Sequence, residues 1–260
     1  MFSAVSPDGS EVACEVVGQG TAILLVHGTA DDRLGFDRVA PLLADRFTLY
    51  MMDRRGRGLS TRQAADYAIE REFEDIVALA AKIADRHGAP TGLFAHSYGA
   101  LCAMGAARTA THIGRMMLYE PPPGTPSTLV NRMVEESAKG NLEGVMHIQF
   151  VELQHQPQAV FDRLKSDHAR WERYLGFAGT IAREFVNARR FSITDGEFAD
   201  IASAVRFIVG EKTFPPLIKY TDTAMRAFVR ADKRLIPGQG HNALRQAPAL
   251  VADEIADFFI

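Results

Sequence analysis

Three side chains suited to nucleophilic catalysis follow apolar or glycine-rich stretches of this sequence. Ser97 lies in Leu-Phe-Ala-His-Ser-Tyr-Gly-Ala (93–100), Glu120 follows the apolar run 113–119, and His241 ends Gly-Gln-Gly-His near the end of the chain. A serine hydroxyl attacks at neutral pH only when a base accepts its proton, and the base needs an orienting partner. A serine, a carboxylate and a histidine in this chain order therefore point to acyl transfer at a serine.

The stretch around Ser97 has the pattern of a nucleophile elbow, a sharp turn from a strand into a helix. The consensus Gly-x-Ser-x-Gly needs small residues two positions before and after the serine, because the two backbones pass close together. Here these positions hold Ala95 and Gly99. The elbow also makes the backbone N–H of Tyr98 a donor to an oxyanion. An ordinary turn whose serine caps the helix is the alternative.

Length and composition indicate one large α/β domain, with or without an insertion. The chain has 260 residues, of which 47% are hydrophobic and 23% charged, enough for a substantial core. A net charge of −3 argues against a nucleic-acid partner. No apolar run reaches the ~18 residues of a membrane span, and the first residues do not resemble a signal peptide, so we expect a cytoplasmic protein. We expect Cys14 and Cys102, in apolar contexts, to be buried thiols.

Strand-like and helix-like segments alternate along most of the chain, which predicts an α/β fold with a doubly wound, mostly parallel sheet. The segment 124–190 has no strand-like run, so we predict a core of 1–123 and 191–260 with an inserted helical cap at 124–190. Strands are expected on both sides of the turn 6–9 and at 22–26, 47–52, 92–95, 113–119, 205–209 and 234–236. Helices are expected at 36–44, 69–86, 98–108, 217–229 and 248–260.

Candidate functional residues cluster at the carboxyl ends of the predicted strands, where ligands bind in sheets of this kind. A helical insertion after Glu120 would cover that edge of the sheet. The residues at strand ends are His27-Gly28, Asp53, Ser97, Glu120, Gly210-Glu211 and His241.

The sequence resembles the α/β-hydrolase family over nearly its whole length. Four segments in the family's order carry the resemblance: His27-Gly28-Thr29, Asp-Arg-Arg-Gly-Arg-Gly-Leu-Ser at 53–60, the elbow, and Gly-Gln-Gly-His at 238–241. The resemblance implies an eight-stranded α/β-hydrolase sheet, with Ser97 as nucleophile and His241 as base. It does not identify a substrate, because this fold hosts many chemistries.

The carboxylate of the triad departs from the commonest family pattern. Most members place an aspartate after the seventh strand, in a segment like Gly-x-x-Asp, and here Thr213 occupies that place. Some members place the carboxylate after the sixth strand, which points to Glu120. Glu211 and an incomplete triad stay open as alternatives. Without a catalytic role, Glu120 would cap a helix or pair with an arginine.

The resemblance also suggests which residues bind the substrate. It assigns the second oxyanion donor to the backbone of Thr29, with Ala30 as the alternative. His27 is expected to shape this loop, His96 to point away from Ser97 into packing, and the Asp53 loop to be mainly structural. We expect His27, Ala30, Phe150, Trp171 and Phe177 to line the pocket, although the cap aromatics could instead pack the cap.

These features predict a cofactor-independent serine hydrolase that cleaves a small or medium apolar ester or lactone through an acyl-enzyme. A serine nucleophile argues against the epoxide hydrolase and haloalkane dehalogenase reactions of this fold, which need a carboxylate nucleophile. No metal-ligand motif is present, so we expect no metal. A lyase, a carbon–carbon bond hydrolase, an acyltransferase and a non-catalytic ligand-binding protein remain alternatives. Whether the chain forms a homodimer stays open.

Overall fold

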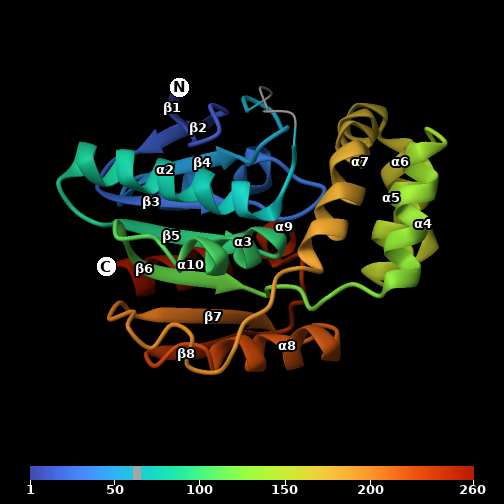
Figure 1. Cartoon of the computed structure of the whole chain (residues 1–260). Coiled ribbons are helices and arrows are strands. Elements are labelled where there is room, and N and C mark those ends of the chain that lie inside the picture. The colour runs from blue at the N-terminus through green and yellow to red at the C-terminus, as the bar shows by residue number, and fades with distance from the viewer. Residues whose placement is uncertain (61–65) are drawn as a thin grey trace. The chain divides into compact units, whose positions relative to one another are not determined.

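Eight strands form one sheet in the computed structural model, which describes residues 1–60 and 66–260 (Figure 1). The strands lie in the order β1-β2-β4-β3-β5-β6-β7-β8. The pairs β1–β2 and β2–β4 are antiparallel and the other neighbours are parallel, so the predicted mostly parallel sheet is confirmed. The strands are β1 Phe2–Val5, β2 Glu11–Gly18, β3 Thr21–Val26, β4 Phe47–Asp53, β5 Thr91–His96, β6 Ile113–Tyr119, β7 Val205–Gly210 and β8 Ala231–Ile236.

Helices cover both faces of this sheet, which is why its central strands are apolar on both sides. Helices α2 and α3 lie on one face and α10 on the other (Figure 1). Phe73 of α2 fits over Gly105 of α3, where an added Cβ would lie 2.3 Å from its ring. The helices are α1 Ala40–Leu43, α2 Ile69–His87, α3 Tyr98–Ala106, α8 Pro215–Met225, α9 Ala243–Gln246 and α10 Pro248–Phe259.

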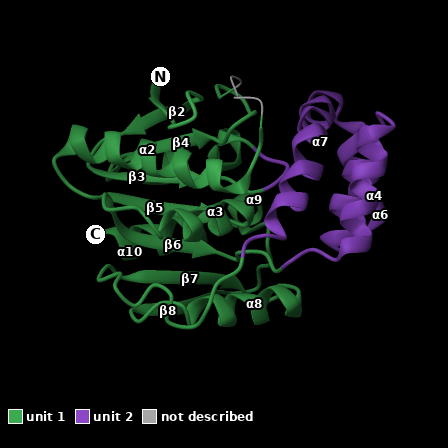
Figure 2. Ribbon diagram, viewed as in Figure 1, with its two compact units in different colours: residues 1–28, 32–123, 192–260 green, residues 29–31, 124–191 purple. Residues whose placement is uncertain are grey.

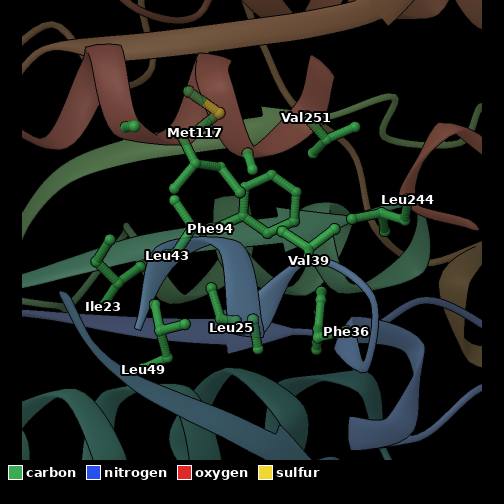
Figure 3. Close-up of a cluster of buried hydrophobic side chains, with 14 of the residues drawn as sticks. Ile23, Leu25, Phe36, Val39, Leu43, Leu49, Phe94, Met117, Leu244 and Val251 are labelled. Atoms are coloured by element: carbon green, nitrogen blue, oxygen red, sulfur yellow. The ribbon is translucent and has the colours of Figure 1, made fainter. Parts of the chain in front are cut away.

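A hydrophobic core fills the space between the sheet and the helices α1, α9 and α10. Figure 3 shows Phe94 of β5 at its centre, with Leu25 of β3, Met117 of β6 and Val251 of α10 around it. All four side chains are fully buried. Burying them contributes about 1.5–3 kcal/mol each relative to an exposed side chain. This packing fixes the strands whose ends carry the candidate site.

The predicted helix 36–44 is wrong in detail, because the chain forms two shorter turns there. A 3₁₀ turn, η1, spans Arg33–Phe36 and is capped by Asp32, whose Oδ1 accepts from the Leu34 N–H at 2.8 Å. Helix α1 then begins just before Pro41. Proline has no N–H to continue a helix from the preceding turn, but it fits the first turn of a new one.

The chain divides into two compact units, coloured green and purple in Figure 2. Unit 1 comprises Met1–Gly28, Asp32–Pro123 and Ser192–Ile260, and unit 2 comprises Thr29–Asp31 and Gly124–Phe191. The segment 124–191 is helical, as the sequence predicts, whereas its role as a cap stays a prediction. Its helices are α4 Ser127–Ala138, α5 Leu142–His147, the π-helical η2 Ile148–Leu153, α6 Gln158–Ser166 and α7 His168–Ala188.

Two further expectations concern burial and hydropathy. Cys14 and Cys102 are buried, as predicted. Within residues 1–60 and 66–260, no helix combines the length and the apolar character needed to cross a membrane.

Candidate active site

Ser97 lies in the sharp turn between β5 and α3. Its φ of 55° and ψ of −123° are rare for a residue with a side chain. Its N–H donates to the Tyr119 carbonyl and its own carbonyl accepts from the Ala100 N–H, each at 2.8 Å. Of the described residues, the partner of Ser97 Oγ is His241 and not the start of α3, so the helix-cap interpretation is wrong.

The space around this turn explains its small residues. A Cβ added at Gly99 would lie 2.5 Å from the His27 carbonyl oxygen and 2.7 Å from that of Val26. A Cβ at Gly28 would lie 2.9 Å from the Ser97 Cβ. The side chain of Ala95, by contrast, is fully buried within β5. The elbow therefore accommodates a methyl group two residues before Ser97, but not two residues after it.

Glu120 is fully buried directly after β6, and each of its carboxylate oxygens is hydrogen-bonded. Its Oε1 accepts from the Gly210 N–H at 2.7 Å and from the Thr213 hydroxyl at 2.5 Å. Its Oε2 lies 2.5 Å from Nδ1 of His241. The interpretations of Glu120 as a helix cap or an arginine partner are therefore wrong. Thr213, at the place where the family resemblance leads one to expect an aspartate, donates to Glu120 instead.

Glu211 has a different role in the structure. Its side chain is exposed, and its Oε2 accepts from the Gly238 N–H at 2.7 Å, which holds the loop after β8. His241, which follows in that loop, contacts Glu120 instead. Of the two carboxylates that the sequence left open, the geometry places Glu120 beside the imidazole.

His241 connects the carboxylate to the serine. Its Nε2 lies 3.0 Å from Ser97 Oγ, while its Nδ1 faces Glu120. A carboxylate beside Nδ1 assigns the proton to that nitrogen, which leaves the Nε2 lone pair directed at the serine hydroxyl. The histidine side chain is 20% exposed and the glutamate side chain is fully buried. This order of groups allows the serine proton to move to the imidazole.

Sequence reasoning missed the polar roles of His96 and Tyr119. The His96 ring packs against the rings of Tyr119 and His241, at centroid distances of 4.9 Å and 4.7 Å. Its Nε2 also donates to the His241 carbonyl at 3.0 Å. Burial, together with the nearby His241, lowers the pKa of His96 well below its ordinary value. Their positions in the sequence could have indicated these roles, because each of the two residues directly precedes a residue of the candidate site.

The predicted oxyanion residues fall in different parts of the structure. Tyr98 is the first residue of α3, where backbone N–H groups point out of a helix. Thr29 and Ala30 belong to unit 2, and Ala30 is buried in the hydrophobic cluster of that unit. His27 donates from Nδ1 to the Gly28 carbonyl at 2.8 Å and accepts at Nε2 from the Arg54 N–H at 3.1 Å. The oxyanion roles of Tyr98 and Thr29 stay predictions.

The Asp53 loop has the structural character that the sequence suggested. Asp53 is fully buried and accepts from the N–H groups of Leu59 and Arg33 at 2.7 Å and 2.9 Å. A Cβ at Gly58 would lie 2.1 Å from its carboxylate. The residue after it, Arg54, is fully buried with its guanidinium 4.8 Å from the centre of the Tyr98 ring.

The predicted pocket aromatics lie in the hydrophobic core of unit 2. Trp171 and Phe177 are buried there, and Phe150 is half-buried against them. Trp171 packs edge-on against Phe161 at 5.5 Å, and Tyr174 packs edge-on against Phe150 at 5.3 Å and Phe177 at 6.1 Å. These contacts show that the aromatics pack unit 2, and contact with a substrate stays a prediction.

Comparison with known proteins identifies the family. Residues 23–254 match the model of the Alpha/beta hydrolase family. The chain belongs to this family. The structure of an alpha/beta hydrolase from Sphaerobacter thermophilus is similar to this family member over 100% of both chains, with a TM-score of 0.84 and 27% identity. The enol-lactonase from Burkholderia xenovorans LB400 shares the fold, with a TM-score of 0.73, 18% identity and 99% coverage of each chain.

Curated relatives of this α/β-hydrolase family member match it only in part. The N-formylmaleamate deformylase of Pseudomonas putida is 36% identical over 112 residues, which is 42% of this chain and 40% of that protein. The probable oxidoreductase EphD of Mycobacterium tuberculosis is 33% identical over 100 residues, which is 37% of this chain and 17% of that protein. The chain thus spans less than half the length of these relatives.

Proposed function

We propose that this protein is a serine hydrolase that cleaves a small or medium apolar ester or lactone through an acyl-enzyme. The observation that carries this proposal is the hydrogen-bonded chain from Ser97 Oγ through His241 to Glu120, at 3.0 Å and 2.5 Å. In the proposed roles, Ser97 is the nucleophile, His241 the general base and acid, and Glu120 the residue that orients the base. The reaction needs no metal and no cofactor.

Acylation begins when Ser97 Oγ attacks the substrate carbonyl carbon while its proton passes to His241 Nε2. The imidazolium that forms is stabilised by Glu120 through the Nδ1–H bond. The carbonyl oxygen becomes an oxyanion, which the backbone N–H groups of Tyr98 and Thr29 bind. The positive end of α3 adds to this stabilisation, because Tyr98 is its first residue.

Collapse of the intermediate breaks the bond to the alkoxide, which takes its proton from His241 Nε2. In a lactone, the alkoxide stays attached to the acyl group. A water molecule then loses a proton to His241 and attacks the acyl carbon. When the second intermediate collapses, the proton returns to Ser97 Oγ and the acid is released.

Three observations support this substrate class. Solved structures of the same fold include an esterase from Rhodococcus sp. ECU1013 and the Burkholderia enol-lactonase. A deformylase is among the partial sequence relatives. Unit 2 contains a hydrophobic cluster rich in aromatic residues; we propose that this unit serves as a cap, a role in which the cluster would favour an apolar acyl or alcohol group.

Paired glutamine substitutions test the assignment of the acid. We expect Glu120→Gln to lower kcat for ester hydrolysis by about 10²–10⁴-fold, because an amide neither holds the imidazole in the required tautomer nor stabilises its cation. Glu211→Gln, the matched control, neutralises an exposed carboxylate that accepts from the Gly238 N–H, a bond that the amide oxygen can keep. Its kcat should stay close to that of the wild type. A larger loss for Glu211→Gln than for Glu120→Gln would contradict the assignment.

A substrate panel tests the reaction class. Purified protein should release acid from short-chain esters or small lactones, measured by product chromatography. The same panel should contain N-formyl amides, β-diketones and an acceptor alcohol. If the protein turned over only these compounds, its reaction would be amide cleavage, carbon–carbon bond cleavage or acyl transfer and not ester hydrolysis. Binding without turnover of any of them would favour a ligand-binding protein.

A further inference from the structure

We propose that His96 and Tyr119 act together as positioning residues, which hold the loop of His241 in a fixed position relative to Ser97 and Glu120. This inference rests on the proposed function and adds two residues to the three of the triad. Neither side chain is placed to react with a substrate carbonyl in the proposed mechanism. Their contacts instead connect the central strands to the backbone that carries the base.

The loop between β8 and α9 holds His241, and side chains from two other strands bind its backbone. The Tyr119 hydroxyl donates to the Gly240 carbonyl at 2.5 Å and accepts from the Ala243 N–H at 3.3 Å. His96 Nε2 donates to the carbonyl of His241 itself at 3.0 Å. These two side chains therefore bind backbone groups before, at and after the base.

The strand register explains why these two side chains act on one loop. His96 and Tyr119 are direct partners in the parallel pair β5–β6, so their side chains lie next to each other on one face of the sheet. Ser97 and Glu120 come directly after His96 and Tyr119, at the ends of the two strands. Each strand end thus supplies one residue that contacts the base and one that holds its loop. Moving the loop relative to the triad would break these hydrogen bonds.

The positioning role also requires that His96 be neutral. Its Nε2 faces a carbonyl oxygen, which assigns the proton to Nε2. Its ring centre lies 4.7 Å from that of His241, which becomes a cation during the proposed reaction. A second cation at this distance would oppose proton uptake by the base. Because His96 is buried, it can donate to the loop without carrying that charge.

Tyr119→Phe tests the proposal with the smallest change, because it removes one hydroxyl and leaves the ring. We expect kcat to fall about 10- to 100-fold, since a displaced base costs rate without changing the substrate contacts. KM should stay within about twofold of the wild-type value. The matched control is Tyr50→Phe, which removes a hydroxyl that is hydrogen-bonded to His87 at 2.8 Å on a buried ring of β4. It should leave kcat unchanged.

His96 is tested by a pair of substitutions. His96→Leu removes the donor to the His241 carbonyl and should lower kcat in the same way. His96→Gln places an amide N–H near the position of Nε2 and should recover most of the loss. Equal losses for leucine and glutamine, or an unchanged kcat in Tyr119→Phe, would overturn the proposal.

A measurement that needs no substrate separates this proposal from the proposed function. The short hydrogen bond from His241 Nδ1 to Glu120 should give a low-field proton resonance in NMR spectra, assigned by its loss in His241→Ala. The resonance should weaken in Tyr119→Phe and His96→Leu and persist in Tyr50→Phe. Such a pattern in a protein that hydrolyses no ester would support the positioning role and reject the function. A resonance that persists in both positioning variants would reject the positioning role.

Discussion

At the scale of single residues, the candidate site depends on a buried carboxylate that is fully hydrogen-bonded. A buried carboxylate without partners costs several kcal/mol, and Glu120 avoids this cost through Gly210, Thr213 and His241. Thr213 illustrates the limit of sequence reasoning. In the sequence it marks a missing aspartate, whereas in the structure it donates a hydrogen bond to Glu120, the residue that we propose for that role. Only the pairing of β6 with β7 reveals this contact.

We expect His96 to make the stability of the protein depend on pH. Burial, with a further contribution from nearby His241, lowers its pKa well below 6.5 in the folded state. The unfolded chain therefore binds a proton near pH 6.5 that the folded chain does not bind, so stability is lost as the pH falls below that value. Between pH 7.5 and 5.5 we expect the wild type to lose about 1 kcal/mol more of its unfolding free energy than His96→Gln does.

Urea denaturation of both proteins at the two pH values measures this difference. Each protein is compared with itself at pH 7.5, so a general loss of stability in the variant does not affect the result. An equal loss in the two proteins would show that His96 takes up its proton in the folded state as readily as in the unfolded chain.

At the scale of elements, the elbow combines a strained turn with close backbone contacts. Ser97 and Glu120 both have positive φ angles, of 55° and 47°. Such conformations cost about 1–3 kcal/mol each and persist only where the surrounding structure imposes them. Here the pairing of β5 with β6 and the buried helix α3 impose them. Part of the strain in the described backbone therefore lies at Ser97 and Glu120 of the candidate site.

A pair of alanine–glycine exchanges tests how tightly this turn is packed. Gly99→Ala puts a methyl group 2.5 Å from the His27 carbonyl oxygen. It should lower the unfolding free energy by about 1–3 kcal/mol and strongly reduce turnover, because the backbone must shift beside Ser97. Ala95→Gly, which restores the consensus residue, should keep turnover near the wild-type level. Melting temperatures and ester turnover are measured for both variants. A Gly99→Ala protein with wild-type stability and turnover would contradict the close approach of the Gly99 and His27 backbones.

The elements themselves were largely predictable from local patterns. The patterns that predict a strand or a helix are formed by residues close together in the sequence. The apolar run 22–26 and the helical spacing of 69–86 are examples, and both segments form the expected elements. The helix predicted at 36–44 failed because Pro41 starts a new turn. The bonds of His96 and Tyr119 were not predictable, since they connect residues more than 100 positions apart in the chain.

At the scale of the whole molecule, the hydrogen-bonded group of Ser97, His241, Glu120 and Thr213 is assembled within unit 1 from distant parts of the chain. Ser97, Glu120 and His241 follow β5, β6 and β8, and Thr213 follows β7. Unit 2 has a hydrophobic core of its own, which includes Trp171, the one tryptophan of the sequence. The order of the motifs predicted that these distant residues meet, because residues at the carboxyl ends of parallel strands lie at one edge of the sheet. The sequence of unit 2 did not reveal a substrate, because its apolar pattern is the same for core packing and for a pocket.

We propose that Ser97 is a nucleophile activated by His241 and Glu120. Reaction with a fluorophosphonate, followed by intact-mass measurement and peptide mapping, tests this role at the residue itself. We expect one adduct, on Ser97, which is absent in Ser97→Ala and forms about 10²–10⁴-fold more slowly in Glu120→Gln. Folded wild-type protein that carries no adduct on Ser97, or carries it on another residue, would show that Ser97 is not the nucleophile.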